Sequence, residues 1–260
     1  MMRISVEAVG VLAPGLPDWE TAREVLATRR AFVPTLLDAP QPGCLPPAER
    51  RRSSPTVRLA IAVAEQALRQ TSLSPQDMAM VFSSYEAAGV ITHQLCEVLA
   101  GTREISPTQF HNSVHNAPSG YYSIAMNAQR AASSICHGEW SFAAGLLNAA
   151  AQAVADHLPV LYVCYDSPLP LPMCEVMPVV EPTVIALVLT PNIGPDSLAT
   201  WDLTIAPKRG ARAWQDWVPS TWHANASARG FAALKSLVIP ESGPVYLPLS
   251  PELDLAVTRC

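Results

Sequence analysis

Three short segments of this 260-residue chain are uninterrupted apolar runs, the last of them bounded by a threonine at each end, and they constrain the fold more than any other feature. They comprise residues 78–82, 160–165 and 183–190. A strand without polar alternation is expected to be buried on both faces, as in a parallel sheet that is covered by helices. The alanine-rich segment 139–156 is predicted to be a central helix, because alanine lets other elements approach its backbone closely. The sequence therefore predicts an α/β fold with helices on both faces of a mixed, mostly parallel, five-stranded sheet.

Capping residues locate several other elements. Asp18 is predicted to cap a helix that runs to about residue 30, and Ser54 followed by Pro55 is predicted to start another. The sequence also predicts strands at 2–12 and 131–136 and helices at 87–99, after Pro107 and after Asn116.

The pattern changes after residue 195, with one strand at 201–205, one helix at 220–237 and one strand at 245–249. We expect two units: a domain of residues 1–195, and a C-terminal appendage of residues 196–260 that packs on it.

Composition excludes several classes of function. Hydrophobic residues make up 49% of the chain, which suffices for a large core, and the net charge of -5 disfavours binding to nucleic acid. No apolar run approaches the roughly 18 residues of a membrane span, and no signal peptide is recognisable, so a cytoplasmic protein is expected. The six cysteines are scattered and indicate reduced thiols, and the glycines form no phosphate-binding loop, so no cofactor is expected.

Two segments carry a family resemblance. They are SPTQFHNSVHNAPSGYYSIAMNAQ, at residues 106–129, and SFAAGLLNAAAQAV, at residues 141–154. Together they resemble the middle of the β-ketoacyl synthase N-terminal domain, in the thiolase-like superfamily, and the resemblance covers about residues 1–190. It implies one half of a thiolase-like fold. In particular, the chain is similar to chain-length-factor-like subunits of aryl-polyene-type and other type II synthases, which serve fatty-acid or polyketide biosynthesis.

The resemblance also indicates a missing nucleophile. Active members carry a cysteine on a tight strand-to-helix turn, where the helix N-terminus stabilises the thiolate. Aligning their Gly-Leu pair with Gly145-Leu146 places Phe142 where that cysteine would stand, with Ser141 beside it. The two family histidines belong to a second half of the fold that this chain is expected to lack, and His223 has no glycine-rich surroundings like theirs. We therefore expect no catalytic residue and no activity of the chain alone.

The resemblance implies instead a heterodimer with an active ketosynthase, which would meet an acyl carrier protein through the complex. In the family, the strand corresponding to residues 131–137 pairs with its twofold mate. The residues expected at the partner interface or the acyl tunnel are Phe110, His111, His115, Asn116, Tyr121, Tyr122, Ser133, Ser134, Ile135, Cys136, Trp140 and Phe142. The basic run Arg50, Arg51 and Arg52 is typical of a solvated face, and the functional alternative is a docking site for the acidic carrier protein.

Other functions stay open on sequence alone. The main alternative is a thiolase-fold acyltransferase that uses Ser141 or Cys136 as an atypical nucleophile, although helix capping suits Ser141 better. Cys136 and His137 are neighbours on a strand, so their side chains point to opposite faces. His111 and His115 are spaced like zinc ligands, but no third ligand lies near them, and no metal site is expected. A further alternative is a homodimeric binding module for a carrier protein or an acyl chain.

Overall fold

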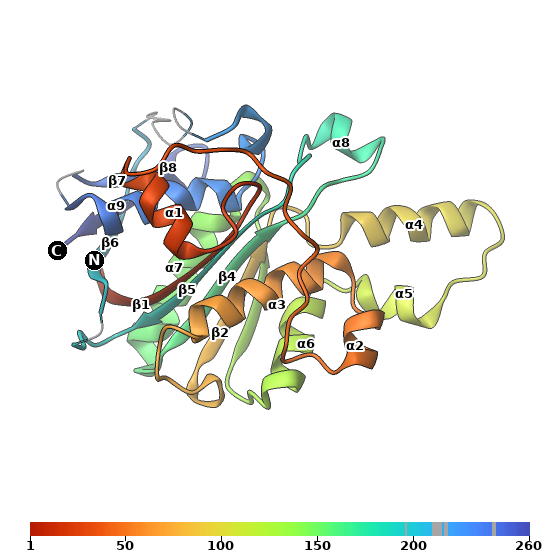
Figure 1. The fold of residues 1–260 in the computed structure, drawn as a ribbon, viewed down its shortest axis with the longest axis horizontal. Helices are drawn as coiled ribbons and strands as arrows, with labels where there is room; N and C mark the ends of the chain where they lie inside the picture. The colour runs from red at the N-terminus through yellow and green to blue at the C-terminus, as the bar shows by residue number, and fades with distance from the viewer. Residues whose placement is uncertain (196, 210–214, 216–217, 241–242) are drawn as a thin grey trace.

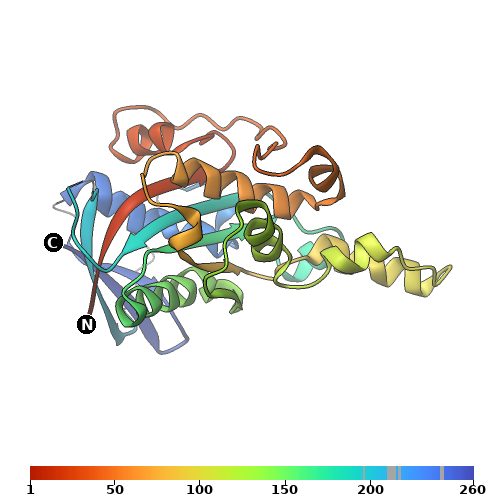
Figure 2. The same ribbon diagram turned by 90° about the horizontal axis from the view of Figure 1, so that it is seen from below.

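In the computed structural model, the described residues are 1–195, 197–209, 215, 218–240 and 243–260. They form one eight-stranded sheet with helices on both of its faces (Figures 1 and 2). The strand order across the sheet is β3-β2-β4-β5-β1-β6-β8-β7. The strands are β1 (Met2–Leu12), β2 (Ala79–Ser84), β3 (Ala132–Cys136), β4 (Val160–Asp166), β5 (Thr183–Thr190), β6 (Ala199–Pro207), β7 (Val245–Pro248) and β8 (Leu253–Arg259).

Each face of the sheet carries its own hydrophobic core. Helices α3 and α6 pack on one face, and α7 and α9 pack on the other, where α1 also contacts α9. The helices are α1 (Trp19–Leu26), α2 (Pro47–Arg52), α3 (Pro55–Leu68), α4 (Gly89–Ala100), α5 (Pro107–Asn112), α6 (Ala117–Met126), α7 (Ser141–Asp156), α8 (Met173–Val176) and α9 (Gly230–Val238). Helix α7 contacts β1, β2, β4 and β5, as expected of a central helix.

The α/β class is confirmed, but the predicted number and direction of the strands are wrong. The described sheet has eight strands rather than five, and only the β2–β3 and β2–β4 pairs are parallel. The other five pairs are antiparallel. Every residue of β5 is buried although both neighbours run antiparallel to it, because helices cover both faces of the sheet. Complete burial of a strand therefore indicates that helices cover both faces of the sheet, but it does not indicate whether the strand runs parallel or antiparallel to its neighbours.

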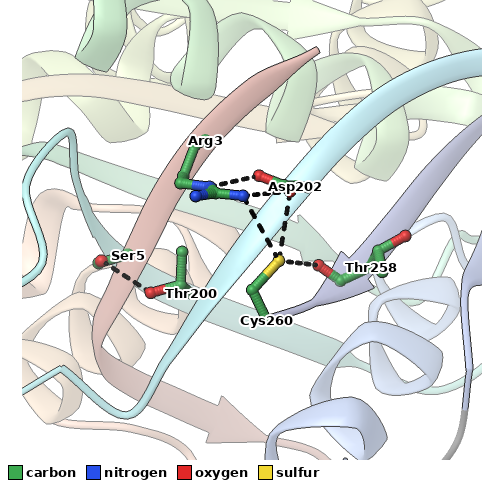
Figure 3. A network of polar contacts seen from close by, with 6 residues as sticks. All are labelled: Arg3, Ser5, Thr200, Asp202, Thr258 and Cys260. Atoms are coloured by element: carbon green, nitrogen blue, oxygen red, sulfur yellow. Dashed lines mark hydrogen bonds and ion pairs between the residues drawn. The ribbon is translucent and has the colours of Figure 1, made fainter.

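The strands that follow residue 195 extend the same sheet. Figure 3 shows how the pairing of β1 with β6 is reinforced: Arg3 donates hydrogen bonds of 2.8 and 2.7 Å to the carboxylate of Asp202, and the Cys260 thiol donates one of 3.2 Å to it. Strand β8, which was not predicted from the sequence, then pairs with β6. The division between residues 195 and 196 stays a prediction, and residue 196 itself lies outside the described residues.

Local capping explains where two helices begin. The Asp18 carboxylate accepts a hydrogen bond of 2.7 Å from the backbone N–H of Thr21, and Ser54 Oγ accepts one of 3.2 Å from Val57. Both predicted caps are confirmed. Helix α1 ends at Leu26, before the predicted residue 30. Among the described residues, no helix is long and apolar enough to cross a membrane.

Candidate functional site

The turn between β3 and α7 is the place where a nucleophile of the resembled family would stand. Strand β3 ends at Cys136, residues 137–140 form the turn, and α7 begins at Ser141. The backbone of Gly138 is left-handed, with φ of +56°, which a glycine adopts without strain. Ser141 Oγ accepts a hydrogen bond of 2.8 Å from the N–H of His137 and donates one of 2.7 Å to the carbonyl of Gly138. The hydroxyl of the fully buried Ser141 thus stabilises the turn rather than capping the helix.

Phe142 lies one residue inside α7 and points into the core. Its side chain is fully buried, and its ring centroid lies 5.5 Å from that of Tyr162. The hydroxyl of Tyr162 donates a hydrogen bond of 2.7 Å to the carbonyl of Phe142 and lies 3.0 Å from Ser83 Oγ. A Cβ on Gly230 would lie only 2.2 Å from the Phe142 ring, so α9 packs directly on that ring. Phe142 therefore fills the interior of this chain and has no exposed surface for a partner.

Cys136 is the nearest thiol to the turn. Its Sγ donates a hydrogen bond of 2.9 Å to the carbonyl of Tyr85. Desolvation of the sulfur raises the pKa of Cys136 above its ordinary value, so the thiol stays protonated at neutral pH. The neighbouring His137 ring packs on Trp140 at 5.3 Å between centroids, and the described contacts include none between this ring and the thiol. In its described contacts Cys136 is therefore a neutral thiol and not the activated thiolate that acyl transfer uses.

A group of carboxylates beside the turn was missed from sequence. Asp166, at the end of β4, is buried, and it accepts hydrogen bonds from the N–H and the hydroxyl of Ser227 and from the N–H of Tyr85. Burial raises the pKa of Asp166, and these hydrogen bonds oppose the rise. Burial, aided by the charge of Asp166, also raises the pKa of Glu86 to about 7. In the sequence, the only indication of this group was Asp166, an acidic residue directly after the apolar run 160–165.

Nearby, Arg229 forms an ion pair with Glu139 of the turn. This pair and the contacts of Asp166 tie the segment before α9 to the ends of β3 and β4. The arrangement stabilises the turn by polar contacts across the chain.

Strand β3 lies at one edge of the sheet, and within the described part of the chain nothing pairs with its outer side. Ser133 Oγ accepts a hydrogen bond of 3.0 Å from Gln152 of α7, and Ser134 Oγ lies 3.2 Å from Ser119 Oγ of α6. Ile135 is half-buried against the core. Helices on both faces of the sheet therefore hold β3 in place, while its outer edge has no strand partner among the described residues.

Helices α4 and α5 form an arm that projects sideways from the sheet (Figures 1 and 2). Helix α4 is largely apolar, yet its only buried residue is Gly89. Phe110 of α5 is 61% exposed, and Ile124 on the neighbouring α6 is 83% exposed. Leu99 and Val114 are exposed as well. Apolar side chains gathered in this way are typical of a surface that another protein covers.

A cavity of about 300 Å³ lies between α2 and α6, close to the base of the arm. Three predicted interface residues line it: His111, Asn116 and Tyr121. The rings of His111 and Tyr121 meet edge to face, with centroids 5.7 Å apart. The remaining lining side chains are mainly apolar, so the cavity suits an apolar group.

Two other predicted interface residues, Tyr122 and His115, do not line this cavity. Tyr122 is buried in the core, with its ring centroid 5.9 Å from that of Phe82. His115 is half-buried, and desolvation lowers the pKa of its ring, so the ring is neutral at physiological pH.

The basic run lies at the end of α2. Arg50 donates a hydrogen bond of 3.3 Å to the carbonyl of Pro42, and Arg52 forms an ion pair of 3.4 Å with Glu49. Arg51 is exposed and makes no contact among those described. A docking role of this run stays a prediction. In the part of the chain that the structure describes, no three His, Cys, Asp or Glu side chains gather as metal ligands.

Comparison with protein families identifies the family of this chain. The model described as "Beta-ketoacyl synthase, N-terminal domain" matches residues 23–235, which is most of the chain. The chain belongs to this β-ketoacyl synthase family. A comparison with curated protein sequences gives no match.

Solved structures of ketosynthases share the fold of this family member. The structure of a ketosynthase (ApeO) in complex with its chain length factor (ApeC) from Xenorhabdus doucetiae contains a chain with a TM-score of 0.75 and 22% identity, and all of both chains is covered. A type II polyketide synthase complex, AntDE:AntF, gives a TM-score of 0.68 at 12% identity over 100% of this chain and 99% of the other. The ishigamide ketosynthase/chain length factor gives 0.67 at 7% identity over 98% of each chain. At these identities the likeness establishes the ketosynthase-like fold.

Proposed function

We propose that this chain is a non-catalytic, chain-length-factor-like subunit, which pairs with an active β-ketoacyl synthase and shapes its acyl pocket. The product would be a fatty acid or a polyketide, such as an aryl polyene. The observation that carries the proposal is the open edge of β3 beside the exposed apolar arm of α4 and α5. Complexes of a ketosynthase with a chain length factor among the structural neighbours support it.

The unpaired edge of β3 can accept a strand from another chain. An unpaired strand edge exposes a row of N–H and carbonyl groups, and a second chain can satisfy them by adding its own strand. A ketosynthase of the same fold has the same edge, so the two strands can pair antiparallel about a twofold axis. Ser133 and Ser134 are held by α7 and α6, which keeps β3 ready for this pairing.

The arm adds apolar area to the proposed interface. Burying an exposed apolar side chain contributes about 1.5–3 kcal/mol, so covering Phe110 and Ile124 would stabilise the complex substantially. The cavity lined by His111 and Tyr121 lies beside these residues and offers space for an apolar group at the same interface. Phe142 and Tyr122 would act from within, by supporting α7 and α6.

The chemistry at the turn supports a subunit without catalysis of its own. The Ser141 hydroxyl is buried in hydrogen bonds, and the Cys136 thiol has a raised pKa. The described hydrogen bonds of these two side chains go to backbone groups, and none reaches a histidine ring or a carboxylate that could activate a nucleophile. A carrier protein would then dock on the complex, where Arg51 is a candidate contact.

Co-expression with a ketosynthase encoded beside this chain tests the proposal. The wild-type pair should co-purify as a heterodimer, and the ketosynthase should need this chain for full activity. The double variant Phe110→Asp/Ile124→Asp should abolish co-purification, because it places charges in the apolar interface. Ile205→Asp is the matched control: this residue is also exposed, on β6, far from β3 across the sheet.

The proposal fails if the ketosynthase never co-purifies with the wild-type chain and works fully without it. Intact mass spectrometry after incubation with acyl-CoA gives an independent check. A covalent adduct on Ser141 or Cys136 would favour the acyltransferase alternative instead.

A further inference from the structure

A second cavity, of about 420 Å³, lies between the end of α1, the segment that follows it and α9. Helix α9 contacts β7 and β8, and β7 is at the opposite edge of the described sheet from β3. The cavity is therefore separate from the proposed ketosynthase interface. Its polar lining includes Thr28, Arg29, Arg30 and Lys235, and Val25 and Phe32 contribute apolar walls.

Positive charge is concentrated in this cavity although the whole chain has a net charge of -5. Arg30 has one acidic neighbour, Glu24, at 3.9 Å, and both side chains are about half exposed. Arg29 and Lys235 have no ion pair or side-chain hydrogen bond among the described contacts. The carboxylate of Glu24 thus offsets at most one of the three cations, and the cavity keeps a positive potential.

Cations near the end of a helix can also serve only to stabilise the helix dipole. Here the carbonyls at the end of α1 already have backbone partners: those of Arg23, Glu24 and Val25 accept hydrogen bonds from the N–H groups of residues 27, 29 and 28. None of the three cationic side chains donates to a carbonyl among the described contacts. Lys235 moreover comes from a different helix, so a shared ligand accounts for the convergence better than capping of α1 does.

The cavity wall is held in place by packing. The ring of Phe32 meets that of Trp222 edge to face, with centroids 5.7 Å apart, and Trp222 is fully buried and stacks on Phe231. Gly15 allows this segment to approach, because a Cβ there would lie 2.4 Å from the carbonyl oxygen of Val33. An apolar wall that is already in position loses less entropy when a ligand binds against it.

We infer that this cavity binds a phosphate monoester, with its phosphate among Arg29, Arg30 and Lys235 and its organic part against Phe32 and Val25. Arginine matches phosphate oxygens with two parallel hydrogen bonds, and lysine adds a point charge. Several cations around one site favour a doubly charged anion over a carboxylate. The apolar wall favours an ester over inorganic phosphate.

Calorimetric titration of the full chain with phenyl phosphate tests this inference, with inorganic phosphate and benzoate as comparison ligands. Phenyl phosphate should bind more tightly than either. Arg29→Gln and Lys235→Gln should each weaken its binding about tenfold, since each removes a charge-assisted hydrogen bond. Arg23→Gln is the matched control, because Arg23 is exposed on α1 and does not line the cavity. It should leave the affinity unchanged.

Thermal denaturation of each variant verifies that it is folded before titration. The inference is overturned if the wild-type chain binds no phenyl phosphate, or if benzoate or inorganic phosphate binds as tightly. It is also overturned if Arg23→Gln weakens binding as much as Arg29→Gln does, because the effect would then be one of general surface charge.

Discussion

The packing of Phe142 against α9 can be tested by two substitutions made singly and together. Phe142 is fully buried, and Gly230 lies directly above its ring. A Cβ on Gly230 would lie 2.2 Å from Cε2 and 2.5 Å from Cζ of Phe142, and 2.8 Å from Cδ1 of Ile185. These distances leave no room for a methyl group unless the ring moves.

The expected magnitudes follow from this geometry. Phe142→Ala should lower the free energy of unfolding by about 3–5 kcal/mol, because it removes a buried ring and leaves a cavity. Gly230→Ala alone should lower it by about 1–3 kcal/mol through overpacking. In the double variant the new methyl group enters the space that the ring has left. The double variant should therefore lose less free energy of unfolding than the two single variants lose in sum, by about 1 kcal/mol or more.

Urea denaturation followed by circular dichroism measures all three free energies. Gly120→Ala is a matched control, because Gly120 is also helical but a Cβ there would meet no atom within 4 Å. This control should be neutral or stabilising by up to about 1 kcal/mol, since alanine favours helices. If the Phe142 and Gly230 effects add within about 0.5 kcal/mol, or if Gly230→Ala costs nothing, the described packing is wrong.

Three further predictions concern titratable groups. The pKa of Glu86 is raised from 4.5 to about 7, so stability should fall as pH rises from 4.5 to 7, by up to about 3 kcal/mol. Glu86→Gln should reduce this fall in urea denaturation, and an unchanged pH profile would contradict the burial of the carboxyl group. Cys136, with its raised pKa, should react with iodoacetamide at neutral pH more slowly than a free model thiol, whereas a faster reaction would indicate an activated thiolate. The hydrogen bond from Arg3 lowers the pKa of Asp202 from 3.8 to about 2, so its stabilisation should be present above about pH 4 and be lost as pH falls towards 2. Asp202→Asn should flatten that acid-side loss, and an identical acid transition in both proteins would refute the role of this pair.

Much of the fold could be predicted because its signals are local. The caps at Asp18 and Ser54 and the buried strands β2, β4 and β5 were readable from short stretches of sequence. Strand β8 was missed because it lies near the chain terminus, close after β7, and because Asp254, Thr258 and Arg259 interrupt its apolar pattern. The boundaries of α1 and α9 were predicted less well than their existence.

The candidate site was only partly predictable. The segment 106–129 was singled out by its resemblance to a family, and three of the interface residues predicted within it line the cavity beside α6. The contacts of Asp166 with Ser227 were not predictable, because the two residues are far apart in sequence and neither belongs to a recognisable motif. For the same reason, it was not predictable that Arg29 and Lys235 line one cavity.

The sequence by itself determined which segments are buried, where helices begin, and that no family-type cysteine precedes Gly145-Leu146. Each of these depends on residue types within one short stretch. Only the tertiary structure decided the direction of the strands and the inward orientation of Phe142. A hydrophobic pattern indicates how deeply a segment is buried, but strand direction and side-chain partners depend on the topology of the whole chain.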